Sequence, residues 1–187
     1  MKQENRKDVR EFLAKEIAES LTKSGLFNDK IKDSILFTNV PRRQRAIVEY
    51  GYDHAALLTK EVASILGCEY RSLLVSESKR AQKSLSHEER KSAPKMKYKA
   101  TAKSLDLSER VVIIIDDIVT TGSSMAVTAS YIRALGCRKI YGASISIAYA
   151  DGTYTVATWR TKPMSESFAF IIKMFTAQSS MLPSLPI

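Results

Sequence analysis

The sequence Val111-Val-Ile-Ile-Ile-Asp116-Asp117-Ile-Val-Thr120-Thr121-Gly122-Ser123-Ser124 carries the pattern that decides the fold. Its first five residues are all β-branched, which is typical of a strand buried on both faces at the centre of a parallel sheet. Two carboxylates follow this apolar run, then a short turn of Thr, Gly and Ser, and then residues 125–135, which have the composition of a helix. We therefore predict a strand, an acidic pair, a polar turn and a helix in succession.

The polar turn has the composition of an anion-binding helix N-terminus. Backbone N–H groups and hydroxyls gather there, and the partial positive charge of the helix end favours a phosphate group. Gly122 lets the backbone approach a ligand closely and adopt an unusual dihedral angle. Asp116 and Asp117 would repel that phosphate, but they suit hydroxyl groups, or a divalent cation, on the same ligand. A sugar phosphate meets these demands together, so we predict one as the ligand.

An ordinary strand–loop–helix junction with a capping Ser or Thr is the alternative interpretation. Such a cap needs one hydroxyl residue, whereas here four of them flank a glycine and follow two adjacent carboxylates. A nucleotide P-loop is a poor match, because no Gly-Lys-Ser/Thr follows the glycine. A dinucleotide fingerprint is also a poor match, because the turn has a single glycine.

Composition and charge set the general class. The 187 residues are 44% hydrophobic, which suits one domain with a real core. The N-terminus is charged and no apolar run could span a membrane, so we expect a cytoplasmic protein without a signal peptide. Cys68 and Cys137 are too few for a disulfide framework or metal knuckle, and we expect structural thiols. A net charge of +9 indicates an anionic partner: nucleic acid, a membrane face or an anionic small molecule.

Most of that charge lies in one segment. Between Lys79 and Lys103 there are nine basic and two acidic residues, which leaves +7 of the net charge there. A long polar connection inside a compact domain is usually disordered or a functional lid. We expect a lid over an anionic substrate. DNA binding is the competing interpretation, and it is less favoured because Tyr98 is the one aromatic residue available for stacking on bases.

The rest of the chain alternates between helix and strand patterns. Helices are predicted at 5–24 and 55–66, with Asp53 as the N-cap of the second, and strands at 34–40, 70–75 and 138–148. This order predicts an α/β fold, a three-layer parallel sheet with helices on both faces. In the tail, 154–159 alternates like a strand, and a helix is predicted at 168–175. We expect one domain: an N-terminal helix in 1–30, an α/β core in 31–149 with a basic flexible loop at 76–104, and a C-terminal extension in 150–187.

Three arginines follow the predicted strand at 34–40. Arg42, Arg43 and Arg45 stand where strand C-termini gather ligands in open α/β sheets, and guanidinium groups suit anions. A solvated basic turn is the equally weighted alternative.

The stretch from Ile113 to Ser123 resembles the phosphoribosyl-pyrophosphate (PRPP) binding motif of type I phosphoribosyltransferases. The resemblance implies that Asp116 and Asp117 hold the ribose hydroxyls as the catalytic acids. It also implies that the loop binds the 5′-phosphate; its residues are Thr120, Thr121, Gly122, Ser123 and Ser124.

Further segments are similar to the ComF-like (competence-associated) branch of that family. They are Val40-Pro-Arg-Arg43, Gly51-Tyr-Asp53 before an Ala/Leu-rich helix, and Gln82-Lys-Ser-Leu85-Ser86-His-Glu-Glu-Arg90. The sequence departs from that branch in lacking a four-cysteine zinc module, and in having Tyr50 and His54 where Arg and Gln are usual. These departures imply a divergent or minimal member.

The resemblance implies a Mg²⁺-dependent transfer of phosphoribosyl from PRPP to a nitrogen nucleophile, with release of pyrophosphate. Arg42 and Arg43 would bind the pyrophosphate, and Arg80, Lys83 and Arg90 of the flexible loop would close over it. Mg²⁺ would arrive with PRPP and could also contact Asp116 and Asp117. The acceptor, nucleobase-like or an amine, is not identified, and a homodimer is compatible with the tail. The alternative is a non-catalytic PRPP- or nucleotide-binding regulator, or a protein of DNA uptake, with the same fold.

Overall fold

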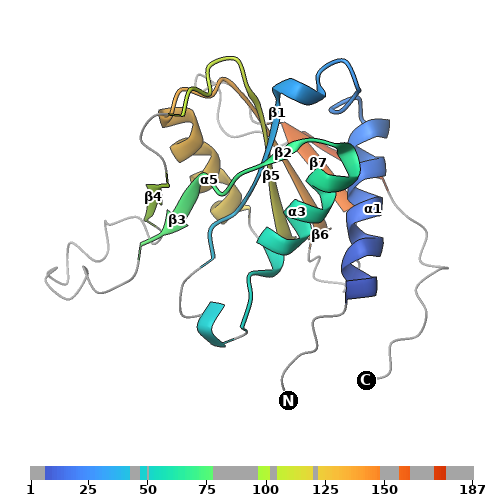
Figure 1. The fold of residues 1–187 in the computed structure, drawn as a ribbon, viewed down its shortest axis with the longest axis horizontal. Helices are drawn as coiled ribbons and strands as arrows, with labels where there is room; N and C mark the ends of the chain where they lie inside the picture. Colours follow the sequence, from blue (N-terminus) through green and yellow to red (C-terminus); the bar gives the residue numbers. More distant parts are fainter. Residues whose placement is uncertain are drawn as a thin grey trace, which may run out of the picture.

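A six-stranded sheet forms the centre of the protein, seen here in a computed structural model (Figure 1). The structure describes residues 7–42, 47–49, 51–77, 97–101, 105–119, 122–147, 156–160 and 171–175, with only the backbone described at 146–147, 156–160 and 171–175. The strand order is β2-β1-β5-β6-β7-β8. The strands are β1 (Ile35–Asn39), β2 (Glu69–Tyr70), β5 (Val111–Val119), β6 (Lys139–Ile147), β7 (Val156–Arg160) and β8 (Ile171–Phe175).

The four strands that precede β7 in the order of this sheet run parallel. β1 lies between β2 and β5, and β5 lies between β1 and β6. β7 and β8 then extend the sheet antiparallel beyond β6. The predicted α/β class with a parallel sheet is confirmed, and the antiparallel extension is an addition that the sequence pattern did not show.

The apolar run of β5 is divided between the two faces of the sheet. Successive side chains of a strand point to opposite faces. Val112 and Ile114 accordingly join one core cluster, while Ile113 and Ile115 join the other. Each of these four residues is completely buried. A strand covered on both faces needs such an unbroken apolar run, which is why the pattern predicted its central position.

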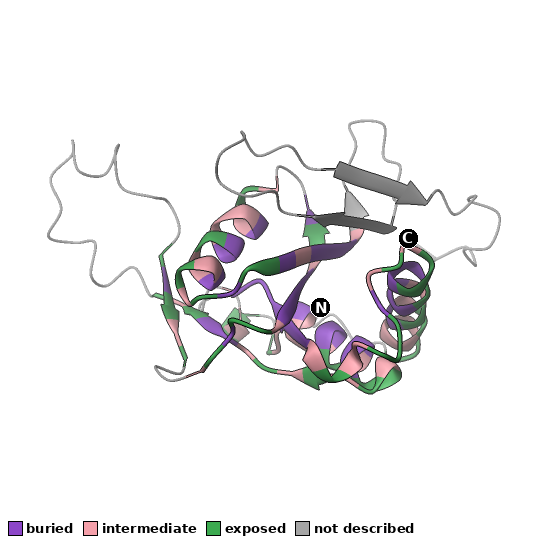
Figure 2. Cartoon of the chain, turned by 90° about the horizontal axis from the view of Figure 1, so that it is seen from above, coloured by how far each residue is buried: buried purple, intermediate pink, exposed green. Residues whose placement is uncertain are grey.

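Three helices cover the two faces of the sheet. α1 (Lys7–Lys23) packs on α3 (His54–Leu66) over one face, and α5 (Ser123–Ala134) lies over the other (Figure 1). α3 begins at Asp53, whose carboxylate accepts a hydrogen bond from the Ala56 amide at 3.0 Å, so the predicted N-cap is confirmed. A short 3₁₀ helix at Lys32–Ser34 leads into β1. Figure 2 shows the buried residues on the central strands and on the inward sides of the helices.

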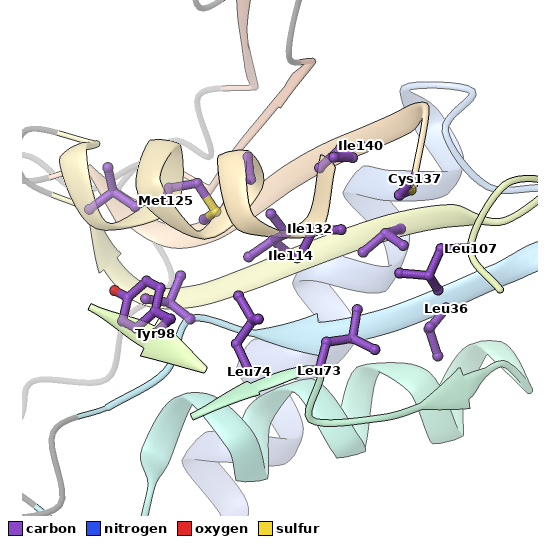
Figure 3. Close-up of a cluster of buried hydrophobic side chains, with 14 residues drawn as sticks. Leu36, Leu73, Leu74, Tyr98, Leu107, Ile114, Met125, Ile132, Cys137 and Ile140 are labelled. Atoms are coloured by element: carbon purple, nitrogen blue, oxygen red, sulfur yellow. The ribbon is translucent and has the colours of Figure 1, made fainter. Parts of the chain in front are cut away.

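A separate two-stranded sheet extends the core on the side of α5. Its antiparallel strands are β3 (Leu74–Ser76) and β4 (Tyr98–Ala100). Leu74 and Tyr98 are buried with Met125 and Ile132 of α5 in one cluster (Figure 3). β3 thus ends at Ser76, the first residue of the predicted basic loop, and β4 lies within the predicted range of 76–104.

Two predicted elements are wrong. The single strand at 70–75 is two short strands in different sheets, β2 and β3, because the Leu73 amide bonds to the Thr38 hydroxyl at 3.3 Å and leaves the main ladder. The predicted helix at 168–175 contains β8 instead, because residues 171–175 pair with β7. A partner strand overrides local preference in such short apolar segments.

Within the described part of the chain, no helix is long and apolar enough to cross a membrane.

Candidate active site

The acidic pair lies on the last part of β5 and not after it. β5 runs nine residues to Val119, because its ladder with β6 continues past the apolar run and pairs Asp116 with Ser144. The Asp116 carboxylate accepts a hydrogen bond from the Asp117 amide at 3.0 Å, and the Asp117 carboxylate accepts one from the Ile118 amide at 2.9 Å. These local bonds hold both carboxylates at the carboxyl end of the parallel strands, where ligands bind in open α/β sheets.

Asp116 has a strongly perturbed pKa. Burial, and then the negative charge of Asp117 and a hydrogen bond with its side chain, raise the pKa of Asp116 to about 7. The Asp117 amide and the charge of Arg42 oppose that rise without cancelling it. Asp116 is thus poised to exchange a proton near neutral pH, a property that is common among groups at functional sites.

Arg42 reaches the acidic pair from the neighbouring strand. It follows β1, which lies beside β5, and its Nη1 atom is 3.7 Å from Asp117 Oδ2. Both side chains are about 30% exposed, at 31% for Arg42 and 28% for Asp117, although the Nη1 atom of Arg42 is itself buried. The structure therefore brings together three of the predicted site residues, from two strands.

The helix that follows β5 begins at the predicted phosphate turn. Gly122 is the N-cap of α5 with a φ of 71°, a left-handed conformation that glycine adopts at little cost. As a glycine, it has no side chain that could cap the helix end. Ser123 and Ser124 form the first turn, and the Ser124 carbonyl accepts a hydrogen bond from the Thr128 hydroxyl at 2.8 Å. The N-terminus of α5 thus has the geometry that favours an anion.

Some predicted site residues lie outside the described residues. They are Arg43 at the first strand end, Thr120 and Thr121 in the phosphate turn, and Arg80, Lys83 and Arg90 in the basic segment.

Three polar residues near the site were not predicted from the sequence: Ser144, Asn39 and Tyr70. Ser144 is buried and its hydroxyl donates to the main-chain oxygen of Asp117 at 3.4 Å. Asn39, at the end of β1, is 4% exposed and accepts a hydrogen bond from the Tyr70 hydroxyl at 2.9 Å. The signal that could have found Asn39 is a polar amide at the end of an apolar strand, directly before Val40 and Pro41.

The donor set of the site fits a divalent cation that a ligand brings with it. Among the described residues, no group of three or more His, Cys, Asp and Glu side chains could hold a metal ion. Asp116 and Asp117 still offer carboxylate oxygens, and Mg²⁺ is commonly bound by one or two carboxylates together with substrate phosphates. An acidic pair, an arginine and a helix that begins at a glycine thus lie at the position where the sequence predicted a sugar-phosphate site.

Residues 53–161, more than half of the chain, match the family model described as "Phosphoribosyl transferase domain". The chain belongs to this family. The match covers β5, the acidic pair and α5, but it begins after β1 and Arg42. The prediction of the phosphoribosyltransferase family is therefore confirmed, whereas nothing in the match distinguishes the ComF-like branch.

Two curated relatives carry the name ribose-phosphate pyrophosphokinase. The protein of Pyrococcus furiosus is 29% identical over 140 residues, which cover 74% of this chain and 38% of the relative. The protein of Thermococcus kodakarensis is 29% identical over 93 residues, which cover 50% of this chain and 28% of the relative. The chain thus matches well under half the length of either.

Two of the solved structures to which the chain is similar carry phosphoribosyltransferase names. A purine phosphoribosyltransferase from Pyrococcus horikoshii is 16% identical with a TM-score of 0.48, and the match covers 74% of this chain and 73% of that one. A hypoxanthine-guanine phosphoribosyltransferase from Bacillus anthracis is 10% identical with a TM-score of 0.48, covering 75% of this chain and 69% of that one.

Proposed function

We propose that the protein binds PRPP and transfers its phosphoribosyl group to a nitrogen nucleophile, with release of pyrophosphate. The observation that carries this proposal is the convergence of two carboxylates and one guanidinium at the end of β5, directly before a helix that begins at a glycine. PRPP offers a matching partner for each group: a diol, a pyrophosphate and a 5′-phosphate. Membership of the phosphoribosyl transferase domain family supports the same reaction.

The acidic pair is proposed to hold the ribose. Carboxylates accept hydrogen bonds from the two ring hydroxyls. The hydrogen bonds that Asp116 and Asp117 accept from neighbouring backbone amides fix the orientation of both carboxylates before the ligand binds. In glycosyl transfer the transition state resembles an oxocarbenium ion, so positive charge develops on the sugar ring. Two carboxylates beneath that ring stabilise this charge, which favours the transition state over the ground state.

Arg42 is proposed to bind the pyrophosphate, together with Arg43. The bond from the sugar C1 to the pyrophosphate oxygen breaks, a bond from C1 to the acceptor nitrogen forms, and the acceptor proton passes to solvent or to a base. The leaving group carries away the electron pair and gains negative charge, which a guanidinium stabilises. When PRPP binds, Arg42 must leave its 3.7 Å contact with Asp117 and contact the pyrophosphate instead. The ribose diol then replaces Arg42 as the partner of Asp117.

The remaining predicted roles extend this arrangement. Mg²⁺ bound with PRPP would neutralise phosphate charge and could be held by Asp116 and Asp117. The helix end at Gly122, Ser123 and Ser124, with Thr120 and Thr121, would bind the 5′-phosphate. Arg80, Lys83 and Arg90 would cover the pyrophosphate and exclude water. We further propose that the whole chain is one domain that works in the cytoplasm on nucleotide metabolism.

A ligand screen tests the proposal. Thermal unfolding of the purified protein should shift upward with PRPP, and more so with Mg²⁺, because a ligand that binds the native state stabilises it. Ribose 5-phosphate, pyrophosphate and nucleoside monophosphates serve as partial ligands that identify which part of PRPP is bound. Release of pyrophosphate in the presence of candidate bases and amines then tests catalysis. If PRPP and its fragments all leave the unfolding temperature unchanged, the proposal fails.

A non-catalytic role is the second candidate, and the basic segment favours it. In this proposal the protein is a ComF-like regulator that binds PRPP or a nucleotide, or acts in DNA uptake. Lys97 and Lys99 at the edge of that segment are exposed, so they are available to an anionic polymer. DNA affinity should then fall steeply with salt and on neutralising Lys95, Lys97 and Lys99. A gel shift without binding at low salt would exclude the DNA version.

A further inference from the structure

A chain of hydrogen bonds connects the edge strand β2 to the segment that carries Arg42. The Tyr70 hydroxyl donates to Asn39 Oδ1 at 2.9 Å, across 31 residues of sequence. Asn39 Nδ2 donates to the carbonyl oxygen of Val40 at 3.1 Å. Asn39 is buried, and the pair bridges the end of β1 to its neighbour β2. This series of hydrogen bonds thus ends at the peptide group that leads into Pro41 and Arg42.

The chemistry of the three groups determines which of them donates and which accepts each hydrogen bond. A backbone carbonyl can only accept, so the amide nitrogen of Asn39 must face Val40 and its oxygen must face Tyr70. The Tyr70 hydroxyl must then be the donor, which requires its protonated form. Burial, followed by the negative charge of Asp53, raises the pKa of Tyr70 and keeps that form at neutral pH. A carboxylate at position 39 would place two acceptors against each other at Val40.

The peptide held by this chain is the last one before the Arg42 segment leaves the sheet. The Val40 amide donates to the Ile115 carbonyl of β5 at 3.0 Å. Pro41 has no N–H group, so it cannot donate a hydrogen bond to a neighbouring strand. The Val40 carbonyl is therefore a point at which the fold can orient this segment, and Asn39 binds it.

We propose that Tyr70 and Asn39 are positioning residues that aim Arg42 at the pyrophosphate of the ligand. This inference rests on the proposed function of Arg42. Tyr70 acts through Asn39 and not on the ligand itself. Its ring is also contacted from α3, where Lys60 Nζ lies 5.4 Å from the ring centroid. The edge strand β2, only two residues long, thus has a role in the site beyond closing the sheet.

The test separates the two ends of the ligand. Calorimetry is run with Mg²⁺-pyrophosphate, which needs Arg42, and with ribose 5-phosphate, which needs the acidic pair and the helix end. Tyr70→Phe removes only the donor, and pyrophosphate affinity should fall about fivefold, the order expected for one neutral hydrogen bond. Affinity for ribose 5-phosphate should stay within about twofold. Asn39→Asp should weaken pyrophosphate binding more, because it reverses the hydrogen bond to Val40.

Matched controls keep the result interpretable. Tyr131→Phe removes a hydroxyl from a half-buried tyrosine on α5 and should leave both affinities unchanged. Thermal unfolding of each variant verifies that it is folded. Equal loss of both ligands in Tyr70→Phe, or no loss of either, would overturn the inference while leaving the proposed function intact. If the unchanged protein binds ribose 5-phosphate but not pyrophosphate, the role of Arg42 and this inference both fail; if it binds neither, the proposed function fails.

Discussion

The two ends of the parallel sheet both combine acids with arginines, but in opposite proportions. At the amino end Glu69 accepts hydrogen bonds from Arg110 and from Arg71, each at 2.6 Å. Burial alone would raise the pKa of Glu69, but the hydrogen bonds and charges of the two arginines outweigh it and lower the pKa. At the carboxyl end, among the described residues, Arg42 Nη1 lies 3.7 Å from Asp117 Oδ2, and the pKa of the neighbouring Asp116 is raised.

The difference separates stability from function. The carboxylate of Glu69 is paired with two arginines, and these ion pairs stabilise the amino end of the sheet. At the carboxyl end, the described residues place two carboxylates beside one arginine, and the raised pKa of Asp116 reflects a negative charge that its surroundings do not fully stabilise. Groups with such perturbed pKa values gather at binding sites, where a cationic or hydroxyl-rich ligand can satisfy them. The following predictions test this contrast, from the largest effect to the smallest.

The largest effect is expected on binding at the carboxyl end. Asp117→Asn removes a charged acceptor for the ribose hydroxyls, and we expect PRPP affinity to fall on the order of 100-fold, or about 2.7 kcal/mol. Calorimetry measures this loss. Glu69→Gln is the matched control at the amino end and should leave PRPP affinity unchanged. Equal losses in the two variants would contradict the assignment of binding to one end.

The second effect is a gain in stability from Asp116→Asn. Folding raises the pKa of Asp116 to about 7, whereas the unfolded chain releases this proton near pH 3.9. Between these values the folded state holds more protons, so its stability falls as pH rises from about 4 to 7. The asparagine variant lacks that cost and should be about 2 kcal/mol more stable at pH 8, but not at pH 4. Urea unfolding at both pH values measures the difference.

The third effect has the opposite sign and the opposite pH dependence. Glu69→Gln should lower stability by about 1 kcal/mol, since a partly exposed ion pair contributes little more than that. Because folding lowers the pKa of Glu69, its contribution is present above the ordinary glutamate pKa and lost on further acidification. Urea unfolding at pH 7 at low and high salt measures the loss. A gain in stability would show that this end is not compensated.

The smallest effect shows which arginine contributes more to stability at the amino end. Arg71 is the more exposed partner, with 47% of its side chain accessible against 28% for Arg110. Arg71→Gln should therefore cost only about 0.3 kcal/mol, within the range of exposed pairs. Arg110→Gln should cost more, because Arg110 also donates to the Ile35 carbonyl at 3.5 Å. Comparing the two unfolding midpoints sharpens the contrast, and equal costs would argue against it.

Local patterns predicted the elements whose causes are local. The apolar run of β5, the Asp53 cap and the helix after Gly122 each depend on neighbouring residues, and the structure has them. The split of residues 70–75 and the strand β8 depend on partners far along the chain, so the pattern around them did not reveal them. A short apolar segment fits a helix or a strand until its neighbours are known.

The same distinction holds for the site. Asp116, Asp117 and Arg42 were predicted because their chemistry stands out at strand ends, and the structure places Arg42 against Asp117. Asn39, Tyr70 and Ser144 were not, because each matters through a hydrogen bond to a group that only the fold brings near. Such supporting residues have ordinary types in ordinary places, and sequence carries little signal for them.

The ladder between β3 and β4 has a consequence for how this chain can change over evolutionary time. Ser76 pairs with Tyr98, and the Glu77 amide bonds to the Lys97 carbonyl at 2.9 Å, so the ladder brings the two ends of residues 78–96 together. The entropy of closing a loop grows only with the logarithm of its length, about 0.6 kcal/mol per doubling. For a flexible connection, a change of length between those ends would therefore cost the fold little, because β3 and β4 stay paired.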